Sequence, residues 1–213
     1  MLAGEPKWRR RKEARPAEII AAALEVFAER GFAAARLDDI AARAGVSKGA
    51  LYLYFETKQD LFTAVVREAV APNLDQVAAL ASAIEMPFAD LTRLFYQRAA
   101  DIFTVSKVGA VAKMVVGESR NFPEIARVWH DEVVVKALGL VGGFIARAQA
   151  KGEVRAGDPR LMAVSMMGPM ILGVLWREVL EPAGAEPIDI RALAAQHAET
   201  VLAGLLLPKG PGQ

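Results

Sequence analysis

Residues 37–61 read LDDIAARAGVSKGALYLYFETKQDL, and the helical periods in this stretch decide how the rest of the chain is interpreted. Gly45 follows a set of apolar residues at helical spacing, and a helix ends readily at glycine because a positive φ meets no Cβ penalty. Ser47 then stands where a second helix needs a side-chain cap. Thr57 and Asp60 have the spacing of a capping box for a third helix. The stretch therefore predicts two short helices around a tight turn, followed directly by a third. The apolar set that defines the first helix is Leu37, Ile40, Ala41 and Ala44.

The second of these helices contains several residues that do not favour a helix. Leu51 and Phe55 supply a buried side at i and i+4, whereas Gly49 and two tyrosines are poor helix formers. A helix in the major groove of DNA needs side chains for base edges and methyl groups, together with groups that contact phosphates. The pattern alone also fits a plain helical hairpin, which is the alternative. The residues that we expect at a DNA surface are Arg36, Ser47, Lys48, Gly49, Ala50, Tyr52, Leu53, Tyr54 and Lys58.

The residues of this region resemble the DNA-binding domain of the tetracycline-repressor (TetR) family. The resemblance covers about the first quarter to third of the chain and is carried by Gly31-Phe32, Asp39-Ile40-Ala41, Ala44 to Gly49, Leu51-Tyr52, Tyr54-Phe55, Lys58 and Leu61. It implies a regulator of transcription that binds double-stranded DNA. One place departs from the family, because Ala35-Arg36 stand where a capping Thr or Ser that touches phosphate is usual. The lost cap costs about 1 kcal/mol, and we hypothesise that Arg36 replaces the phosphate contact with a charged one.

The composition of the whole chain excludes several classes of protein. The 213 residues include no cysteine, which rules out disulfides and thiolate chemistry and fits the cytoplasm. The net charge is only +1, so attraction for DNA must come from where the charges lie. The longest uncharged run, residues 161–176, is short for a membrane span and is expected to be a buried helix. With two distant histidines and no phosphate loop, we expect no enzyme activity, no metal and no cofactor.

Helical periods continue along the chain without strand-like alternation and predict an all-α protein of about nine helices. We expect Pro16 to begin the first helix, Gly31 to end it, and Pro72 to kink or break the helix that starts at Lys58. The later helices are expected at 88–105, 107–120, 123–151, 158–180 and 188–207. The expected domains are a basic disordered arm at 1–15, a helix-turn-helix DNA-binding domain at 16–62, a ligand-binding and dimerisation domain at 63–207, and a tail at 208–213. The arm is either a solvated tail or a minor-groove arm; Trp8 is explained by neither.

The helices at 158–180 and 188–207 are apolar over more than one face, and such helices must be covered. A two-fold four-helix interface would cover them, with the same patch used by both subunits. The resemblance implies the same arrangement, because the final two helices form the homodimer in that family. Burial within one subunit is the alternative. A homodimer would place two recognition helices on an inverted-repeat operator with half-sites about 34–36 Å apart.

The middle helices contain aromatic and methionine residues suited to an apolar pocket, along with two polar residues among apolar neighbours. A few polar groups in an apolar cavity are typical of a small-molecule site, although aromatic and Met stripes are usually core and an arginine can extend to solvent. The expected ligand contacts are Phe95, Arg98, Phe103, Met114, Trp129, His130 and Met170. Together these features predict a regulator, by the resemblance a repressor, released by a small hydrophobic effector. The alternatives are a helical DNA-binding protein without a ligand, a membrane-surface protein and an enzyme.

Overall fold

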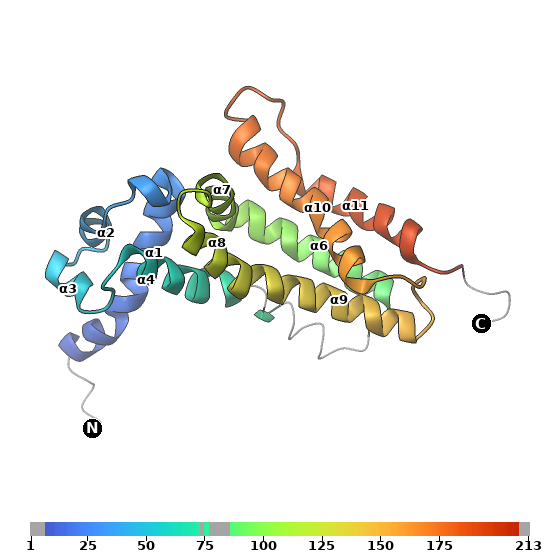
Figure 1. Cartoon of the computed structure of the whole chain (residues 1–213), viewed down its shortest axis with the longest axis horizontal. Coiled ribbons are helices and arrows are strands. Elements are labelled where there is room, and N and C mark those ends of the chain that lie inside the picture. The colour runs from blue at the N-terminus through green and yellow to red at the C-terminus, as the bar shows by residue number, and fades with distance from the viewer. Residues whose placement is uncertain (1–6, 73–74, 77–85, 209–213) are drawn as a thin grey trace.

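The computed structural model describes residues 7–72, 75–76 and 86–208, whose helices form two groups with a pair of helices between them (Figure 1). The N-terminal group consists of α1 (Lys7–Ala34), α2 (Leu37–Arg43), α3 (Lys48–Tyr52) and α4 (Lys58–Val65), which continues as the π-helical turn η1 (Val66–Val70). The second group consists of α6 (Phe88–Val105), α9 (Val135–Ala150), α10 (Pro159–Leu175) and α11 (Ile190–Leu205). The pair between them is α7 (Val108–Glu118) and α8 (Pro123–Trp129); the π-helical turn η2 (His130–Val134) joins α8 to α9, and η3 (Trp176–Leu180) extends α10.

The described residues form nine continuous helices, which confirms the predicted all-α class. Their only extended pairing is an isolated β-bridge between Val154 and Leu206. The helix predicted at 88–105 has the observed bounds of α6, and the helix predicted at 123–151 is observed as the continuous run of α8, η2 and α9. Asp158 caps α10 by accepting the backbone N–H of Arg160 at 2.8 Å, as its place before Pro159 predicts.

The helix ends around the first tight turn follow from local chemistry. Gly45 has φ 66°, the left-handed conformation expected after α2. The Ser47 hydroxyl accepts the backbone N–H of Ala50 at 3.2 Å and so caps α3. Thr57 and Asp60 form both bonds of the capping box, each 3.0 Å long, at the start of α4. These contacts span three residues each, which is why the sequence predicts them.

The start of α1 corrects the expected arm. The helix begins at Lys7, so residues 7–15 are helical rather than disordered and Pro16 lies inside the helix; residues 1–6 lie outside the described part. The prediction rested on Pro16 alone, whereas the lysine, arginine, glutamate and alanine residues before it favour helix. Gly31 has φ 78° and ψ 174° and ends the regular part of α1, as predicted, before a last turn to Ala34.

The helix that begins at Lys58 reaches Pro72 through a π-helical turn rather than breaking before it. Pro72 has no N–H for the carbonyl of Glu68, and its ring crowds that carbonyl. The extra residue in η1 loosens the turn that precedes the proline, which is a common remedy for such crowding. The second apolar stripe expected on this helix, Leu74, Val77, Ala78 and Leu80, lies outside the described residues.

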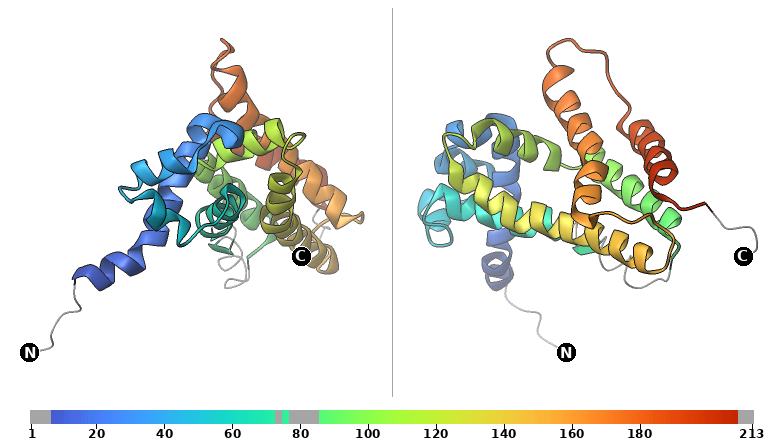
Figure 2. Two further views of the ribbon diagram at one scale, coloured as in Figure 1. Left: turned by 60° about the vertical axis from the view of Figure 1, so that its left-hand side comes forward. Right: turned by 45° about the vertical axis from the view of Figure 1, so that its right-hand side comes forward.

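Two hydrophobic clusters hold these helices together. The first joins Phe27, Leu51 and Phe62 of the N-terminal group to Val111 of α7 and Ile125 of α8. The second is built from α6, α9, α10 and α11. Figure 2 shows α7 and α8, in yellow-green, lying between the blue N-terminal helices and the second group. The expected boundary at residue 62 therefore does not divide the core, because α7 and α8 pack into the core of the helix-turn-helix.

The apolar helix predicted at 158–180 is buried on one side only. Leu161 and Leu172 on its other side are 67% and 58% exposed. The whole helix, Pro159–Leu180, and the helix Pro123–Ala150 are long and apolar enough to cross a membrane by length and composition, a test that core helices also pass. The expectation of a buried helix thus holds for one face of α10, and its other face lacks a cover within the described part of the subunit.

Candidate DNA interface and ligand cavity

The short helix α3 presents one face to the core and another to solvent. Leu51 is fully buried and Phe55 nearly so, and together they anchor the helix on the first cluster. On the outer face Tyr52 is 43% exposed and Leu53 is 82% exposed. A Cβ at Gly49 would meet no atom within 4 Å, so this position leaves open space beside the helix. The outer face of α3 can therefore approach a flat partner closely with one phenol and one branched apolar side chain.

The other residues expected at this surface differ in exposure. Arg36, Ser47 and Lys48 are exposed, whereas Ala50 is half-buried. Tyr54 is half-buried and packs against the first cluster, so it points away from the outer face of α3. Arg36 precedes α2 without capping it through its side chain, as its long guanidinium arm predicts.

Lys48 is held by an exposed ion pair at the edge of this face. Its Nζ lies 2.8 Å from Oδ1 of Asp38 and 6.0 Å from the ring centroid of Tyr52. The hydrogen bond to Asp38, followed by the charge of that carboxylate, raises the pKa of Lys48. Exposed pairs of this kind are screened by solvent and contribute little to stability, so a phosphate can take the place of Asp38 at little cost.

Lys58 lies elsewhere than predicted. Its Nζ donates to the carbonyl oxygens of Phe32 at 2.5 Å, Ala33 at 3.1 Å and Ala35 at 3.1 Å. An ammonium has three N–H donors, so all three are engaged at the end of α1 and none remains for a phosphate. Burial lowers the pKa of Lys58. These contacts favour a structural role for Lys58 over the predicted phosphate contact, because packing of α4 against α1 supplies acceptors that are far away in the sequence.

A cavity of about 130 Å³ lies where the two hydrophobic clusters meet. Trp129 and Val133 on one side pack against the first cluster, and Phe95, Phe103 and Met167 on the other pack against the second. Among the residues that the structure describes, the lining is apolar and uncharged, and Trp129 is its one side chain with an N–H group. The lining residues are Val70, Phe95, Ala99, Ile102, Phe103, Val108, Ala112, Trp129, Val133, Val134, Ala137, Met167, Met170 and Ile171.

Four of the seven predicted ligand contacts line this cavity: Phe95, Phe103, Trp129 and Met170. Met114 lies in the first cluster instead, packed between α7 and the helix-turn-helix. Arg98 is exposed, because α6 buries Thr92, Tyr96 and Ala100 and so turns position 98 toward solvent. The aromatic residues were found from their abundance in the middle helices. The small and branched residues that complete the wall have no signal of this kind.

His130 is also outside the cavity. Its Nδ1 lies 2.7 Å from Oδ1 of its neighbour Asp131, and both side chains are exposed. His130 begins the π-helical turn η2. The extra residue of such a turn changes the direction of the side chains relative to a regular helix, so the apolar neighbours counted at α-helical spacing do not surround His130.

Tyr96 was missed by the sequence analysis. It is fully buried, and its hydroxyl donates to the carbonyl oxygen of Met166 at 2.8 Å. Burial raises the pKa of Tyr96. Its ring meets the ring of His197 edge-on at 5.2 Å, so α6, α10 and α11 converge on this side chain beside the cavity. The signal in the sequence was its i, i+4 spacing from Thr92 and Ala100 on α6.

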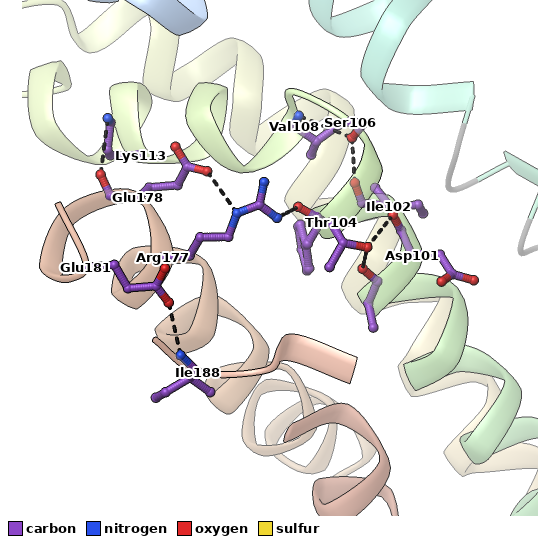
Figure 3. A network of polar contacts seen from close by, with 12 residues as sticks. Asp101, Ile102, Thr104, Ser106, Val108, Lys113, Arg177, Glu178, Glu181 and Ile188 are labelled. Atoms are coloured by element: carbon purple, nitrogen blue, oxygen red, sulfur yellow. Dashed lines mark hydrogen bonds and ion pairs between the residues drawn. The ribbon is translucent and has the colours of Figure 1, made fainter. Parts of the chain in front are cut away.

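Polar contacts join η1 to η2, and η3 to α6 and α7. Arg67 of η1 lies 2.6 Å from Glu132 of η2, through Nε and Oε1. Arg177 of η3 donates through Nη1 to the carbonyl oxygen of Phe103 at 2.6 Å. Figure 3 shows Arg177 extending from η3 to the C-terminal end of α6, and Lys113 of α7 meeting η3 from above. Within the described ranges, no cluster of three or more His, Asp or Glu residues suits a metal ion.

Comparison with known proteins adds to this geometry. Residues 19–65 match a family model described as bacterial regulatory proteins, tetR family. Residues 89–204 match the C-terminal domain of the AefR-like transcriptional repressors. The chain is 27% identical over 209 residues to the transcriptional repressor BepR of Brucella suis, which covers 93% of this chain and 97% of that one.

Two further proteins are similar over different lengths. The transcriptional activator FasR of Mycolicibacterium smegmatis is 39% identical over 88 residues, and the match spans only 40% of that relative's length. Among solved structures, the complex of SmeT with triclosan has a TM-score of 0.75 at 24% identity, covering 94% of this chain and 96% of that one. SmeT is the repressor of a multidrug efflux pump of Stenotrophomonas maltophilia. The likeness to SmeT shows a shared fold.

Proposed function

This chain belongs to the tetR family of bacterial regulatory proteins and is a transcriptional regulator, and we propose that it is a cytoplasmic repressor released by a small hydrophobic effector. As a homodimer it binds an inverted-repeat operator with two copies of α3. The observation that carries the proposal is the position of Val70. This residue belongs to the helical run that starts in the helix-turn-helix, and it also lines the cavity. An effector in the cavity thus touches the helix that leads to the DNA-binding surface.

The DNA surface consists of the outer face of α3 and the charged residues beside it. Tyr52, Leu53 and the open space at Gly49 face base edges and thymine methyl groups, and Lys48 and Arg36 contact phosphates. Ser47 remains a structural cap whose backbone lies at the edge of the same surface. This assignment rests on exposure and on the anchoring of α3 by Leu51.

The homodimer is supported by the uncovered face of α10. Leu161, Val164 and Leu172 are exposed and lie at positions that share one face of α10. A second copy of the same face would remove these side chains from water, at about 25 cal/mol for each Å² of apolar surface. A two-fold axis would also relate two copies of α3, as an operator with two half-sites requires.

The composition and volume of the cavity limit the charge and the size of the effector. The described residues of the cavity walls include no charged side chain, so a charged group inside would lose its hydration without compensation from them. The volume of about 130 Å³ is close to that of an engineered apolar cavity of about 150 Å³ that binds benzene. The effector, or the part of it that enters, is therefore uncharged and about the size of one aromatic ring. Met167 and Met170 give the wall some adaptability.

Release follows from two arrangements of the DNA-binding helices. An effector that prefers the arrangement with the wrong half-site spacing weakens DNA binding by its differential affinity and by no more. A 100-fold release requires about 2.7 kcal/mol, which one buried apolar ring can supply.

The proposal is tested by footprinting on the intergenic DNA beside the gene at two salt concentrations. The wild-type protein is expected to give a salt-dependent footprint of two half-sites. The double variant Lys48→Ala/Tyr52→Ala is expected to lose it, whereas Arg98→Ala, an exposed change on α6, is expected to retain it. A footprint that survives the double variant would show that α3 does not read this DNA.

A further inference from the structure

The helix α7 runs from the cavity to the helix-turn-helix. Val108 and Ala112 in its first half line the cavity. Val111 and Val115 are buried in the first cluster. Glu118 is the last residue of α7, and at 1.5 Å per residue it lies about 9 Å along the axis from Ala112. A packed helix of this length moves as a unit, so a shift at the cavity also reaches Glu118.

The carboxylate of Glu118 binds the segment that follows the kink in α1. Its Oε1 accepts the backbone N–H of Phe32 at 3.0 Å, and its Oε2 accepts that of Ala33 at 2.6 Å. Gly31 immediately before them has φ 78°, and a Cβ there would lie only 2.2 Å from Oε1 of Glu118. Glycine is thus required at position 31 both for its backbone conformation and for the approach of this carboxylate.

Lys58 binds the same segment through its carbonyl groups. The ammonium donates to the carbonyl oxygens of Phe32, Ala33 and Ala35. Two of these residues, Phe32 and Ala33, also donate their N–H groups to Glu118. Burial lowers the pKa of Lys58, and the negative charge of Glu118 opposes this shift in part. The segment 32–35 is therefore fixed between a carboxylate and an ammonium, and it leads directly into α2 and the recognition helix.

We propose that Glu118 is the positioning residue through which α7 sets the orientation of the helix-turn-helix. When a ligand in the cavity displaces α7, the carboxylate carries the segment 32–35 with it and changes the position of α3 relative to the second group of helices. This inference rests on the proposed function for its biological meaning, but the geometry that it describes can be measured without DNA.

Two substitutions at position 118 test the hydrogen bonds of the carboxylate without removing the side chain. Glu118→Gln keeps the length of the side chain but leaves one oxygen for two N–H groups, and its own NH₂ group opposes the other. Glu118→Asp keeps the charge, but its side chain is shorter by one methylene group. The matched control is Glu153→Gln, because Glu153 also accepts a backbone N–H, that of Phe88 at 2.8 Å, within the second group. All three variants disturb a carboxylate–backbone bond, but only two of them lie between the cavity and the DNA surface.

The chain has no cysteine, so two spin labels can be placed without side reactions. In Ala42→Cys/Arg98→Cys, diluted with unlabelled protein, pulsed electron paramagnetic resonance measures the distance from α2 to α6 within one subunit. Glu118→Gln and Glu118→Asp are expected to shift or broaden this distance distribution and, without labels, to weaken operator binding about tenfold. Glu153→Gln is expected to leave both unchanged.

The outcomes separate the two proposals. A wild-type distance distribution and wild-type operator affinity in both Glu118 variants would overturn the positioning role. Equal effects in Glu153→Gln would also overturn it, because they would show a general loss of stability. If the wild-type protein gives no salt-dependent footprint, the proposed function fails, whereas the label distances still report whether Glu118 positions the helix-turn-helix.

Discussion

Arg67 and Glu132 join two π-helical turns that both contribute residues to the cavity wall, with Nε of the arginine 2.6 Å from Oε1 of the glutamate. Arg67 belongs to η1, at the end of the helix that leaves the DNA-binding unit, and Glu132 belongs to η2, which supplies Val133 and Val134 to the cavity wall. Lys136 lies 3.1 Å from the other oxygen of Glu132. Because π-helical turns are looser than regular helix, the ion pair holds together two elements that a ligand can displace.

This ion pair predicts a pH dependence of stability. The hydrogen bonds from Arg67 and then Lys136 lower the pKa of Glu132 below its ordinary value of 4.5. A carboxyl group whose pKa is lower in the folded state stabilises the fold above its unfolded pKa, and this contribution is lost as the pH falls through the folded pKa. Glu132→Gln should therefore lower Tm at pH 6 and narrow its difference from the wild type at pH 4. Parallel Tm curves for the two proteins across this range would contradict the assignment.

The exposed position of Leu172 predicts that this face of α10 forms the interface between subunits. Leu172→Asp places a charge on the uncovered face of α10 and should convert the dimer to a monomer, because an interface that buries an unpaired charge is strongly disfavoured. Sedimentation velocity measures the change. Val116→Asp is the matched control, because Val116 is 62% exposed on α7, away from α10. A dimer that survives in Leu172→Asp would place the interface on another face.

A substitution at Ala99, which lines the cavity, tests whether the effector binds there. Ala99→Leu adds three carbon atoms to the cavity wall and should fill most of a space of about 130 Å³. Toluene serves as the probe, and its binding is measured by titration calorimetry. We expect the affinity for toluene to fall at least about tenfold, since crowding in a core costs about 1–3 kcal/mol, while DNA binding remains. Ala195→Leu on the exposed side of α11 is the control; equal toluene binding in the two variants would place the probe elsewhere.

Lys58 and Lys48 should separate structure from DNA contact. Lys58→Met removes three hydrogen bonds to carbonyl groups and should lower the free energy of unfolding by about 2 kcal/mol, without changing the slope of log affinity against log salt. Lys48→Ala should have little effect on stability, but it should reduce the magnitude of that slope by about 1. Denaturant titration and DNA binding at several salt concentrations measure both effects. A reduced salt slope in Lys58→Met would show that Lys58 does contact a phosphate.

Arg36 provides a further test of the DNA surface. The residue is exposed at the start of α2 and does not cap that helix. Arg36→Ala should therefore leave Tm unchanged and reduce the magnitude of the salt slope by about 1, because one phosphate contact is lost. An unchanged slope with full affinity would show that Arg36 does not take the place of the missing capping residue. Arg98→Ala, an arginine exposed on α6, is the control for the loss of one positive charge.

The helix ends and the recognition helix could be predicted from the order of residues alone. Gly45, Ser47, Thr57 and Asp158 act on backbone groups two or three residues away, so their neighbours in the sequence are their partners in space. The abundance of aromatic and methionine residues in the middle helices likewise pointed to four residues of the cavity, Phe95, Phe103, Trp129 and Met170. These features depend on local geometry and on composition, which the chain carries in any fold.

Packing between distant segments decided the rest. The face of α6 that is buried, and with it the exposure of Arg98, depends on the helices that lie against it. Lys58 turns to carbonyl groups 23 to 26 residues earlier in the chain, and Glu118 reaches N–H groups 85 and 86 residues away. The uncharged wall of the cavity is formed where two hydrophobic clusters meet. No period or motif encodes these relations, because each exists only after helices that are far apart in the chain have come into contact.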